Sequence, residues 1–271
     1  MKKLIIILFF ASILLAWQSL AFAGNFGSPN PVAVHGGFAL GVGYLHNESK
    51  WEPQDDSFFG ISYIWKDDAE TKSDRVYVQG SFSFLKNWEV YARFGAADMR
   101  VENAFSDLAD FKGDYEPFGT VGIRGLFYNG GSWGIGPFAQ ANYVFTDFEN
   151  DFSTLGIIDG MLVHASGKRK YENPWDISAG VACYMKQGIV NFYGGPFLYW
   201  GKADTEDDIE LIDVGTDTLV ISASDSTTYQ EKGNLGGYLG VQVSLGRGFN
   251  LEVEAIAKKR IGFGTALTYS F

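Results

Sequence analysis

The segment Ile261-Gly-Phe-Gly-Thr-Ala-Leu-Thr-Tyr-Ser-Phe271 alternates in character over its whole length. Its odd-numbered positions are mostly large and apolar, and its even-numbered positions are all small or weakly polar. Successive side chains of a β-strand point to opposite faces, so this period of two predicts a strand with one apolar and one small, polar face. The same pattern recurs along the chain, and we therefore expect an all-β fold.

The first 23 residues have the character of a secretory signal peptide. Residues 1–3 are Met-Lys-Lys, residues 4–20 are almost continuously apolar, and Ala21-Phe22-Ala23 places small residues before Gly24. No cluster of positive charge follows this segment to stop its transfer across a membrane. We therefore expect the chain to be exported, and we exclude residues 1–23 from the fold.

The terminal strand resembles the closing strand of bacterial outer-membrane β-barrels, because Leu267 and Tyr269 lead at alternate positions to a terminal Phe271. In that family the terminal aromatic residue is part of the signal that the barrel assembly machinery recognises. The resemblance implies a barrel in the outer membrane of a Gram-negative bacterium, in contact with outer-membrane lipid and, during assembly, with that machinery.

The composition excludes several other classes. Without residues 1–23, which contain Lys2 and Lys3, the chain keeps 19 basic residues (21 − 2) against 32 acidic ones, so a nucleic-acid partner is not expected. Cys183 is the only cysteine, so disulfides contribute nothing. No apolar run after residue 23 approaches the length of a membrane helix. The 34 glycines and the aromatic fraction of 16% suit a closed membrane barrel.

Strand-like alternation defines ten segments joined by short links at one end and long polar links at the other. With both termini in the periplasm the number of strands is even, so we predict an antiparallel up-and-down barrel of ten strands, with eight and twelve as alternatives. Residues 24–33 are rich in turn formers and are interpreted as a periplasmic lead-in. The predicted strands are 38–44, 76–84, 88–94, 121–127, 133–145, 175–183, 190–200, 235–245, 249–255 and 261–271. The predicted extracellular loops are 46–74, 99–116, 147–171 and 202–231.

One further segment, residues 57–65, also alternates and would make the strand number odd. We interpret it as a β-extension of the first loop, rising above the membrane. The alternative is that it is the true first strand, with residues 34–45 in the lumen or the periplasm. The third and fourth loops contain apolar triplets, Met161-Leu162-Val163 and Leu219-Val220-Ile221, that are able to form hairpins.

The predicted inward faces carry the charged residues of the strands. Because charges removed from water need partners, we expect these side chains to pair and the lumen to be plugged. A narrow, charge-lined path for small ions is the alternative interpretation. The charged residues concerned are Glu89, Arg93, Arg124, Glu252 and Glu254.

Two basic triplets lie at the predicted extracellular rim, Lys168-Arg169-Lys170 and Lys258-Lys259-Arg260. Lipopolysaccharide presents phosphates at that level, and Lys and Arg are the side chains that bind phosphate. Lipopolysaccharide is therefore a candidate partner, and solvation of loop ends is the alternative. The first and fourth loops are acidic, but their spacing matches no calcium loop, so we expect neither a metal nor a cofactor.

The segment His164-Ala-Ser166-Gly167 offers the one candidate for catalysis. It is similar to the His-x-Ser pair of outer-membrane phospholipase A and of the lipid A deacylase, in which His activates a Ser nucleophile and a third polar residue orients the His. Here Asn173, Glu172 or Asp176 would be the orienting group. Those families have Asn after the Ser, where this chain has Gly167.

The sequence as a whole predicts an outer-membrane β-barrel without catalytic activity. Its expected role is in envelope structure, in surface adhesion or in narrow passage of small solutes, and we expect a monomer. A lipid hydrolase using His164 and Ser166 is the alternative function.

Overall fold

The computed structural model describes residues 26–33, 35–54, 69–102, 110–158 and 161–271. In chain order its strands are β1 (Phe38–Pro53), β2 (Ala69–Leu85), β3 (Trp88–Glu102), β5 (Phe111–Gly125), β6 (Tyr128–Asn129), β7 (Trp133–Val144), β8 (Phe148–Ile158), β9 (Met161–Gln187), β10 (Val190–Asp213), β11 (Thr218–Glu231), β12 (Leu235–Gly246), β13 (Phe249–Ala257) and β14 (Ile261–Ser270). Within these ranges, no helix has the length and apolar character needed to cross a membrane.

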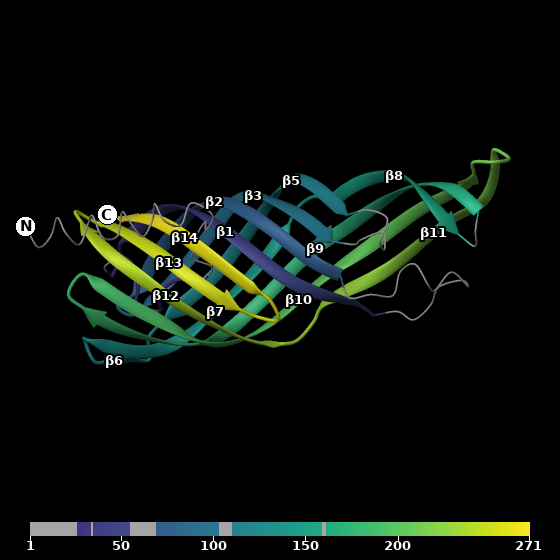
Figure 1. Cartoon of the computed structure of the whole chain (residues 1–271). Helices are drawn as coiled ribbons and strands as arrows, with labels where there is room; N and C mark the ends of the chain where they lie inside the picture. Colours follow the sequence, from purple (N-terminus) through teal and green to yellow (C-terminus); the bar gives the residue numbers. More distant parts are fainter. Residues whose placement is uncertain (1–25, 34, 55–68, 103–109, 159–160) are drawn as a thin grey trace, which may run out of the picture.

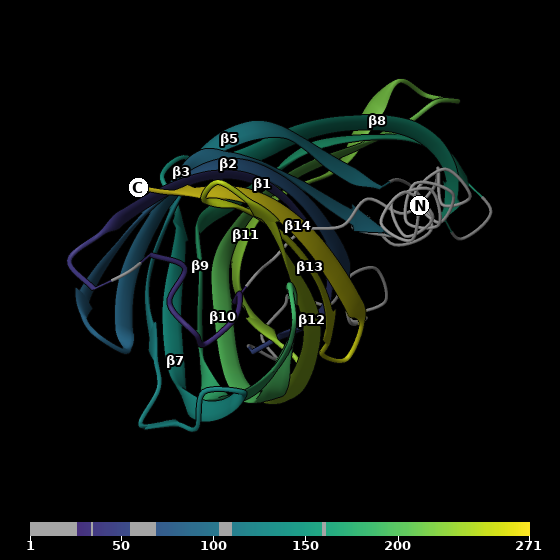
Figure 2. The same cartoon turned by 90° about the vertical axis from the view of Figure 1, so that its left-hand side faces the viewer.

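Antiparallel pairing closes the sheet into a barrel, which Figure 2 shows end-on. Within the described residues, ten strands pair in a cycle that runs β1-β2-β3-β5-β7-β9-β10-β12-β13-β14 and returns to β1. The closing seam joins β1 to β14 from Ala39↔Ser270 to His46↔Phe263. The predicted antiparallel barrel is confirmed. Residues 57–65 lie outside the described residues, so their role and the total number of membrane strands stay predictions.

Side chains alternate between the two faces of the barrel wall, as the sequence predicted. On β12, Leu239 is 74% exposed on the outer face, whereas its neighbour Tyr238 is 3% exposed and points inward. On β5, Val121 is 64% exposed and Thr120 is 3% exposed. Apolar residues therefore cover the outside of the barrel, and polar and aromatic residues fill its interior.

The strands have unequal lengths, and the long ones all project from the same end of the barrel (Figure 1). β9 has 27 residues and β10 has 24, whereas β13 has nine. The short turns β2–β3, β9–β10 and β12–β13 lie at the opposite end, and Gly188 has φ +64° in the second of them. We call the two ends of the molecule the long-strand end and the short-turn end.

The long links predicted as polar loops are largely β-structure, which corrects the sequence prediction. Strand β8 pairs with residues 161–171 of β9, and β11 pairs with residues 202–213 of β10. Together these segments form a four-stranded antiparallel sheet, called the extension below. The hairpins expected around Leu162 and Val220 are confirmed. Charged side chains lie on both faces of these segments, and the inward-facing Arg169 and Asp207 form an ion pair with each other.

β-Bulges interrupt the ladders close to where the extension begins. The pairing of β10 with β9 shifts between Lys202 and Asp204. Opposite this shift, Asn173 adopts a left-handed conformation with φ +49°. The pairing of β3 with β5 shifts between Ala97 and Met99. A bulge adds an unpaired residue to one strand, so the wall bends at this level.

Residues 26–33 lie inside the barrel, where Figure 2 shows the purple N-terminal trace within the ring. Phe26 is 0% exposed and Ser28 is 0% exposed. The interpretation of residues 24–33 as a periplasmic lead-in is therefore wrong for the part that the structure describes. We call residues 26–33 the N-terminal plug.

The sorting of side chains predicts a contrast between two Leu→Arg variants. Leu239→Arg places a charge on the apolar outer face near the middle of β12, and we expect it to lower the free energy of unfolding by about 2–4 kcal/mol in lipid vesicles. Leu219→Arg makes the same change in the extension, where Leu219 is 55% exposed, and should change it by less than about 0.5 kcal/mol. Urea titrations of both variants check this, and equal effects would contradict the assignment of the outer face.

Candidate functional site

A buried ion pair inside the barrel links β3 to β5. Arg124 donates from Nη2 to Glu89 Oε1 at 2.7 Å and from Nε to the same oxygen at 3.1 Å. The two residues are Cα partners in the strand register, and their side chains are 1% and 0% exposed. Burying a charge costs several kcal/mol of free energy unless the charge is paired and hydrogen-bonded. Removal of either Glu89 or Arg124 would therefore leave the other as an uncompensated buried charge.

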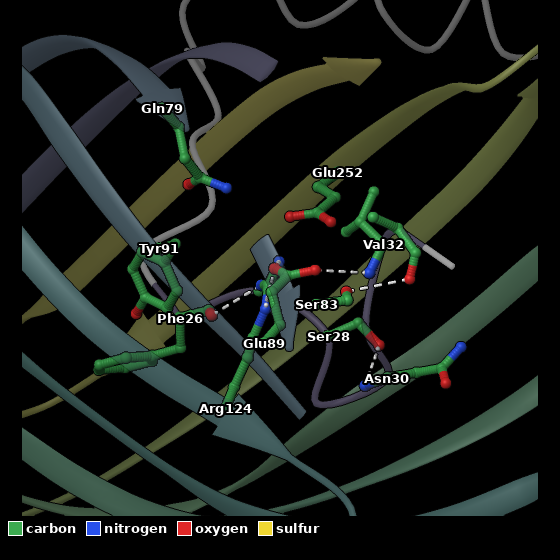
Figure 3. Close-up of polar contacts among 12 residues, drawn as sticks. Phe26, Ser28, Asn30, Val32, Gln79, Ser83, Glu89, Tyr91, Arg124 and Glu252 are labelled. Atoms are coloured by element: carbon green, nitrogen blue, oxygen red, sulfur yellow. Dashed lines mark hydrogen bonds and ion pairs between the residues drawn. The ribbon is translucent and has the colours of Figure 1, made fainter. Parts of the chain in front are cut away.

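The same charged groups hold the N-terminal plug through its backbone (Figure 3). Arg124 Nη1 donates to the carbonyl oxygen of Phe26 at 3.1 Å, and Glu89 Oε2 accepts from the N–H of Val32 at 2.8 Å. Glu254 accepts from the N–H groups of Phe26 and Gly27 at 2.9 Å each. Backbone groups buried away from water need such partners, and here the barrel wall supplies them.

The backbone of the plug approaches the wall so closely that one position requires glycine. Gly27 has φ +74°, which L-residues other than glycine rarely adopt, and a Cβ at this position would overlap Nη1 of Arg124. The contact between plug and guanidinium therefore depends on the absence of a side chain at residue 27.

Aromatic packing fills the space around the plug. The ring of Phe26 lies 4.7 Å from those of Phe138 and Phe197 and 5.0 Å from that of Tyr238, measured between centroids. These three partners come from β7, β10 and β12, so one side chain of the plug contacts three parts of the wall. Pairs at these separations add stabilisation to that of simple burial.

The other end of the plug is hydrogen-bonded to the wall as well. Ser83 Oγ donates to the carbonyl of Ala33 at 3.0 Å, and Ser270 Oγ donates to that of Val32 at 3.1 Å. Asn191 Nδ2 donates to Ser28 Oγ at 2.9 Å. The plug is thus held along its length by β2, β10 and β14 as well as by the charged residues.

The remaining predicted lumen residues also lie inside the barrel and have partners there. The guanidinium of Arg93 lies 4.8 Å from the ring centroids of Tyr77 and Tyr91, and its Nε donates to Gln79 at 2.8 Å. Glu252 accepts from Gln242 Nε2 at 2.8 Å. All five charged residues singled out from the sequence are therefore in the interior, and three of them, Glu89, Arg124 and Glu254, bind the plug.

Further toward the long-strand end, Asp176 organises a second polar layer. It accepts from Asn142 Nδ2 at 2.6 Å and from Arg75 Nη2 at 3.4 Å. A cavity of about 50 Å³ adjoins this layer, with room for only a few water molecules.

The interior of the extension is filled by aromatic rings and a buried ion pair. Arg169, at 2% exposure, donates to Asp207 from Nε at 2.5 Å and from Nη2 at 2.6 Å. Tyr171 lies beside it, with its ring 4.8 Å from that of Phe111. Burial raises the pKa of the Tyr171 hydroxyl, and the positive charge of Arg169 offsets this only in part. The middle residue of the first basic triplet therefore points inward, away from any lipid.

The two outer residues of that triplet, Lys168 and Lys170, bind carboxylates of their own chain. Lys168 pairs with Glu149 at 2.7 Å. Lys170 pairs with Asp147 at 3.1 Å and with Glu172 at 2.6 Å. A lipid phosphate would have to compete with these carboxylates for each ammonium group.

The second basic triplet is engaged in a similar way. Lys258 pairs with Glu231 at 3.1 Å and lies 4.6 Å from the ring centroid of Tyr199, and Arg260 pairs with Glu70. Burial raises the pKa of the Glu231 carboxyl, while Lys258 lowers it. Lys259 lies in the turn between Lys258 and Arg260. Lipopolysaccharide binding through the two triplets stays a prediction.

The structure does not bring the proposed orienting groups of the candidate catalytic site to His164, whereas Ser166 lies two residues from it on β9, opposite Ser153. His164 Nε2 is hydrogen-bonded to Ser153 Oγ at 2.8 Å, a residue of β8 that sequence spacing did not indicate. None of the three proposed orienting groups is bonded to His164 in the described hydrogen bonds: Asn173 accepts from Tyr143, Glu172 pairs with Lys170, and Asp176 binds Asn142 and Arg75.

The terminal strand lies at the seam of the barrel. Phe271 is 65% exposed and Leu267 is 41% exposed on the outer face. The ring of Tyr269 contacts those of Phe271 and Phe249 at centroid distances of 4.9 and 4.8 Å. The residues proposed as an assembly signal therefore form one outward-facing row, and their recognition by the assembly machinery stays a prediction.

The buried pair predicts a large loss of stability when one partner is neutralised. Glu89→Gln leaves Arg124 buried without its counter-charge, and we expect the free energy of unfolding to fall by about 3–5 kcal/mol. Glu149→Gln removes an exposed partner of Lys168 and serves as the matched control, with an expected loss of less than about 1 kcal/mol. Urea unfolding followed by tryptophan fluorescence measures both, and similar losses would contradict the role assigned to Glu89.

No family model and no curated protein matches the sequence. The fold resembles several solved structures. They include the translocator domain of autotransporter NalP from Neisseria meningitidis, at 13% identity over 86% of this chain and 87% of that chain with TM-score 0.42. The outer membrane protease OmpT from Escherichia coli aligns at 9% identity over 94% and 99% with TM-score 0.39. The P. putida toluene transporter TodX aligns at 10% identity over 90% and 73% with TM-score 0.40.

At these identities and scores, the likeness carries no argument about activity. The architecture carries the assignment instead. The sheet closes on itself, its outer face is apolar, its inner face holds the paired charges, and the terminal strand forms part of the closing seam. The chain has the fold of bacterial outer-membrane β-barrel proteins, and no narrower family is shown.

Proposed function

We propose that this protein is a non-conducting barrel that anchors a rigid β-sheet at the bacterial surface. The observation that carries the proposal is the N-terminal plug, which occupies the lumen and is bound by Glu89, Arg124 and Glu254. In this role the barrel supplies attachment to the membrane, and the extension is the part available for envelope structure or adhesion.

The charged residues of the lumen favour the hypothesis of a sealed barrel and argue against a narrow path for ions. A permeating ion would need water or fixed ligands along its route, whereas Glu89, Arg124 and Glu254 are already bound to each other or to the plug. Barrels of about this size hold little more than their own side chains. Passage of an ion would therefore require displacement of the plug.

The extension supports a role at the cell surface. It projects from the long-strand end (Figure 1), which is the extracellular end if the short turns lie in the periplasm as in other bacterial barrels. Its inner face buries Tyr171 and Leu211 at 6% exposure or less, Tyr171 lies beside Arg169 of the Arg169–Asp207 pair, and Phe111 of β5 packs against Tyr171. A sheet with its own core keeps its shape outside the membrane. Because closure leaves no strand edge within the barrel wall, we also propose a monomer.

Conductance of planar bilayers tests the proposal. We expect the full chain to give no steady openings, and a variant lacking residues 26–33 to conduct because its lumen has lost the plug. The Glu149→Gln variant, altered only in the extension, is the control and should stay silent. Steady, well-defined openings of the unaltered protein would show a small-solute channel and overturn the proposal.

We further propose that the barrel does not hydrolyse lipid. The hydrogen bond of His164 to Ser153, together with the engagement of Asn173, Glu172 and Asp176 elsewhere, supports this. Ser166→Ala and Ser153→Ala should therefore leave fatty-acid release from phospholipid and lipid A at the background level of the unaltered protein. Fatty-acid release that depends on either serine would instead support the hypothesis of a lipid hydrolase.

A further inference from the structure

The outer face of the barrel has an apolar hollow of about 780 Å³, called the first hollow below. It follows a lateral row of register partners that crosses β1, β2, β3, β5 and β7, and register partners of an antiparallel pair share one face of the sheet. Gly or Ala occupies three of the five positions in this row, so the outer surface is low there and the larger side chains around it form a rim. The row is Leu40, Gly80, Ala92, Val121 and Ala141.

A second apolar hollow, of about 420 Å³, lies on the other side of Leu40, over the seam between β1 and β14. Leu40 and Gly80 line both hollows. A Cβ at Gly80 would meet only Cδ2 of Leu40, at 4.0 Å, so a side chain at this position would enter open space. Leu40 is therefore a ridge between the two hollows, and the sequence leaves the space beside it unfilled.

The first hollow runs obliquely across the wall. Its lining includes Leu40, the third residue of β1 counted from the short-turn end, and Ile177, which lies ten residues (187 − 177) before the short turn between β9 and β10. The hollow therefore rises from the short-turn end at β1 towards the long-strand end at β9. A long, flexible hydrocarbon chain is able to follow such a path.

The internal loops outside the described residues do not reach either hollow. Residues 55–68, 103–109 and 159–160 are joined to the strands at least nine residues from any lining residue, about 30 Å along a strand. A segment held at both ends extends by at most half of its length, about 25 Å for residues 55–68, the longest of the three. These loops therefore leave both hollows open to the surroundings of the barrel.

An unpaired cation lies below the lower end of the first hollow. Phe82 and Val90, which are register partners, border the hollow towards the short-turn end. Lys86 lies in the turn between β2 and β3, four residues from each of them along the chain. Its side chain is exposed, and it forms no ion pair with another described residue. Two residues further on, Trp88 has the type of ring that gathers at membrane–water interfaces.

We propose that the wall over β1, β2 and β3 binds one glycerophospholipid of the periplasmic leaflet. The short turns of bacterial barrels face the periplasm, which places Lys86 at the level of the phosphates of that leaflet. Lys86 binds the phosphate, and the two acyl chains lie on either side of Leu40, one in each hollow. The chains gain van der Waals contacts that the small side chains of the wall leave unmade. A second barrel presents a convex wall, which follows an oblique hollow less closely than a flexible chain does.

This inference rests on the membrane placement that the proposed function also requires, and it is independent of the sealed lumen. Lipid retention and bilayer conductance are separate measurements. A barrel that conducts and still retains the lipid would overturn only the proposed sealing. A silent barrel that retains no lipid would overturn only this inference.

The probe is dioleoyl phosphatidylglycerol, added to the full chain in detergent micelles and counted by native mass spectrometry. We expect one lipid to be retained in a saturable manner. Gly80→Phe fills the space where the hollows meet and Lys86→Gln removes the charge, so each should weaken retention at least about fivefold. The matched controls are Gly237→Phe, at an outer-face glycine of β12 whose Cβ would meet only one carbonyl oxygen at 3.9 Å, and Lys186→Gln, in the turn between β9 and β10. Both should retain the lipid as the unaltered chain does.

A second pair of variants keeps the test independent of a single substitution. Ala92→Leu fills the first hollow from β3, and Ala255→Leu makes the same change at an exposed position of β13 outside both hollows. Compact migration on unheated gels shows that each variant has kept its barrel. Dioleoylglycerol, which has the same chains and no phosphate, should bind at least about fivefold more weakly than the phospholipid.

Four outcomes would overturn the proposal. They are equal retention by the unaltered chain and both filled variants, an equal loss in the matched controls, equal binding of dioleoylglycerol, and a dimer of the chain that Gly80→Phe dissolves. Loss of the lipid in the filled and Lys86→Gln variants, with the controls unchanged, supports it.

Discussion

The whole structure depends on the requirement that backbone N–H and C=O groups in a lipid environment be hydrogen-bonded within the protein. An unpaired group in hydrocarbon costs several kcal/mol, and a sheet meets the requirement only when its first and last strands join. Here β14 meets β1 over eight consecutive residue pairs, from Ala39 to His46. The alternation of the strands follows from the same constraint, because the outer face must be apolar and the inner face need not be.

Closure creates an interior that has to be filled, and this chain fills it with its own N-terminal residues. The backbone groups of the plug need hydrogen-bond partners, and the side chains of Glu89, Arg124 and Glu254 in the barrel wall supply them. The charged residues of the lumen thus have two tasks. They neutralise each other, and they hold a segment that has no secondary structure of its own.

Much of this arrangement could be predicted from the sequence, because a period of two is a strong signal. It placed the membrane strands, the apolar outer face and the five charged lumen residues on the correct side of the wall. The plug could not be predicted in this way. Residues 26–33 have no periodicity, and most of their polar contacts with the wall use main-chain atoms, which are the same whatever the side chains are.

The extension was interpreted as loops because its residues are polar, although alternation continues there. Followed through β9 from the outward-facing Ile177, that alternation would have turned Arg169 outward. The bulge at the left-handed Asn173 shifts the period by one residue, so that Arg169 faces inward instead.

The bulges at the base of the extension have a mechanical consequence. β9 and β10 run without a break in the chain from the membrane wall into the projecting sheet, so a pull on the sheet acts directly on the barrel. The ladders between β9 and β10 and between β3 and β5 are both interrupted at about the same height. We expect bending to be easiest at that level, so that the projecting sheet tilts under shear while the segments embedded in the bilayer keep their alignment.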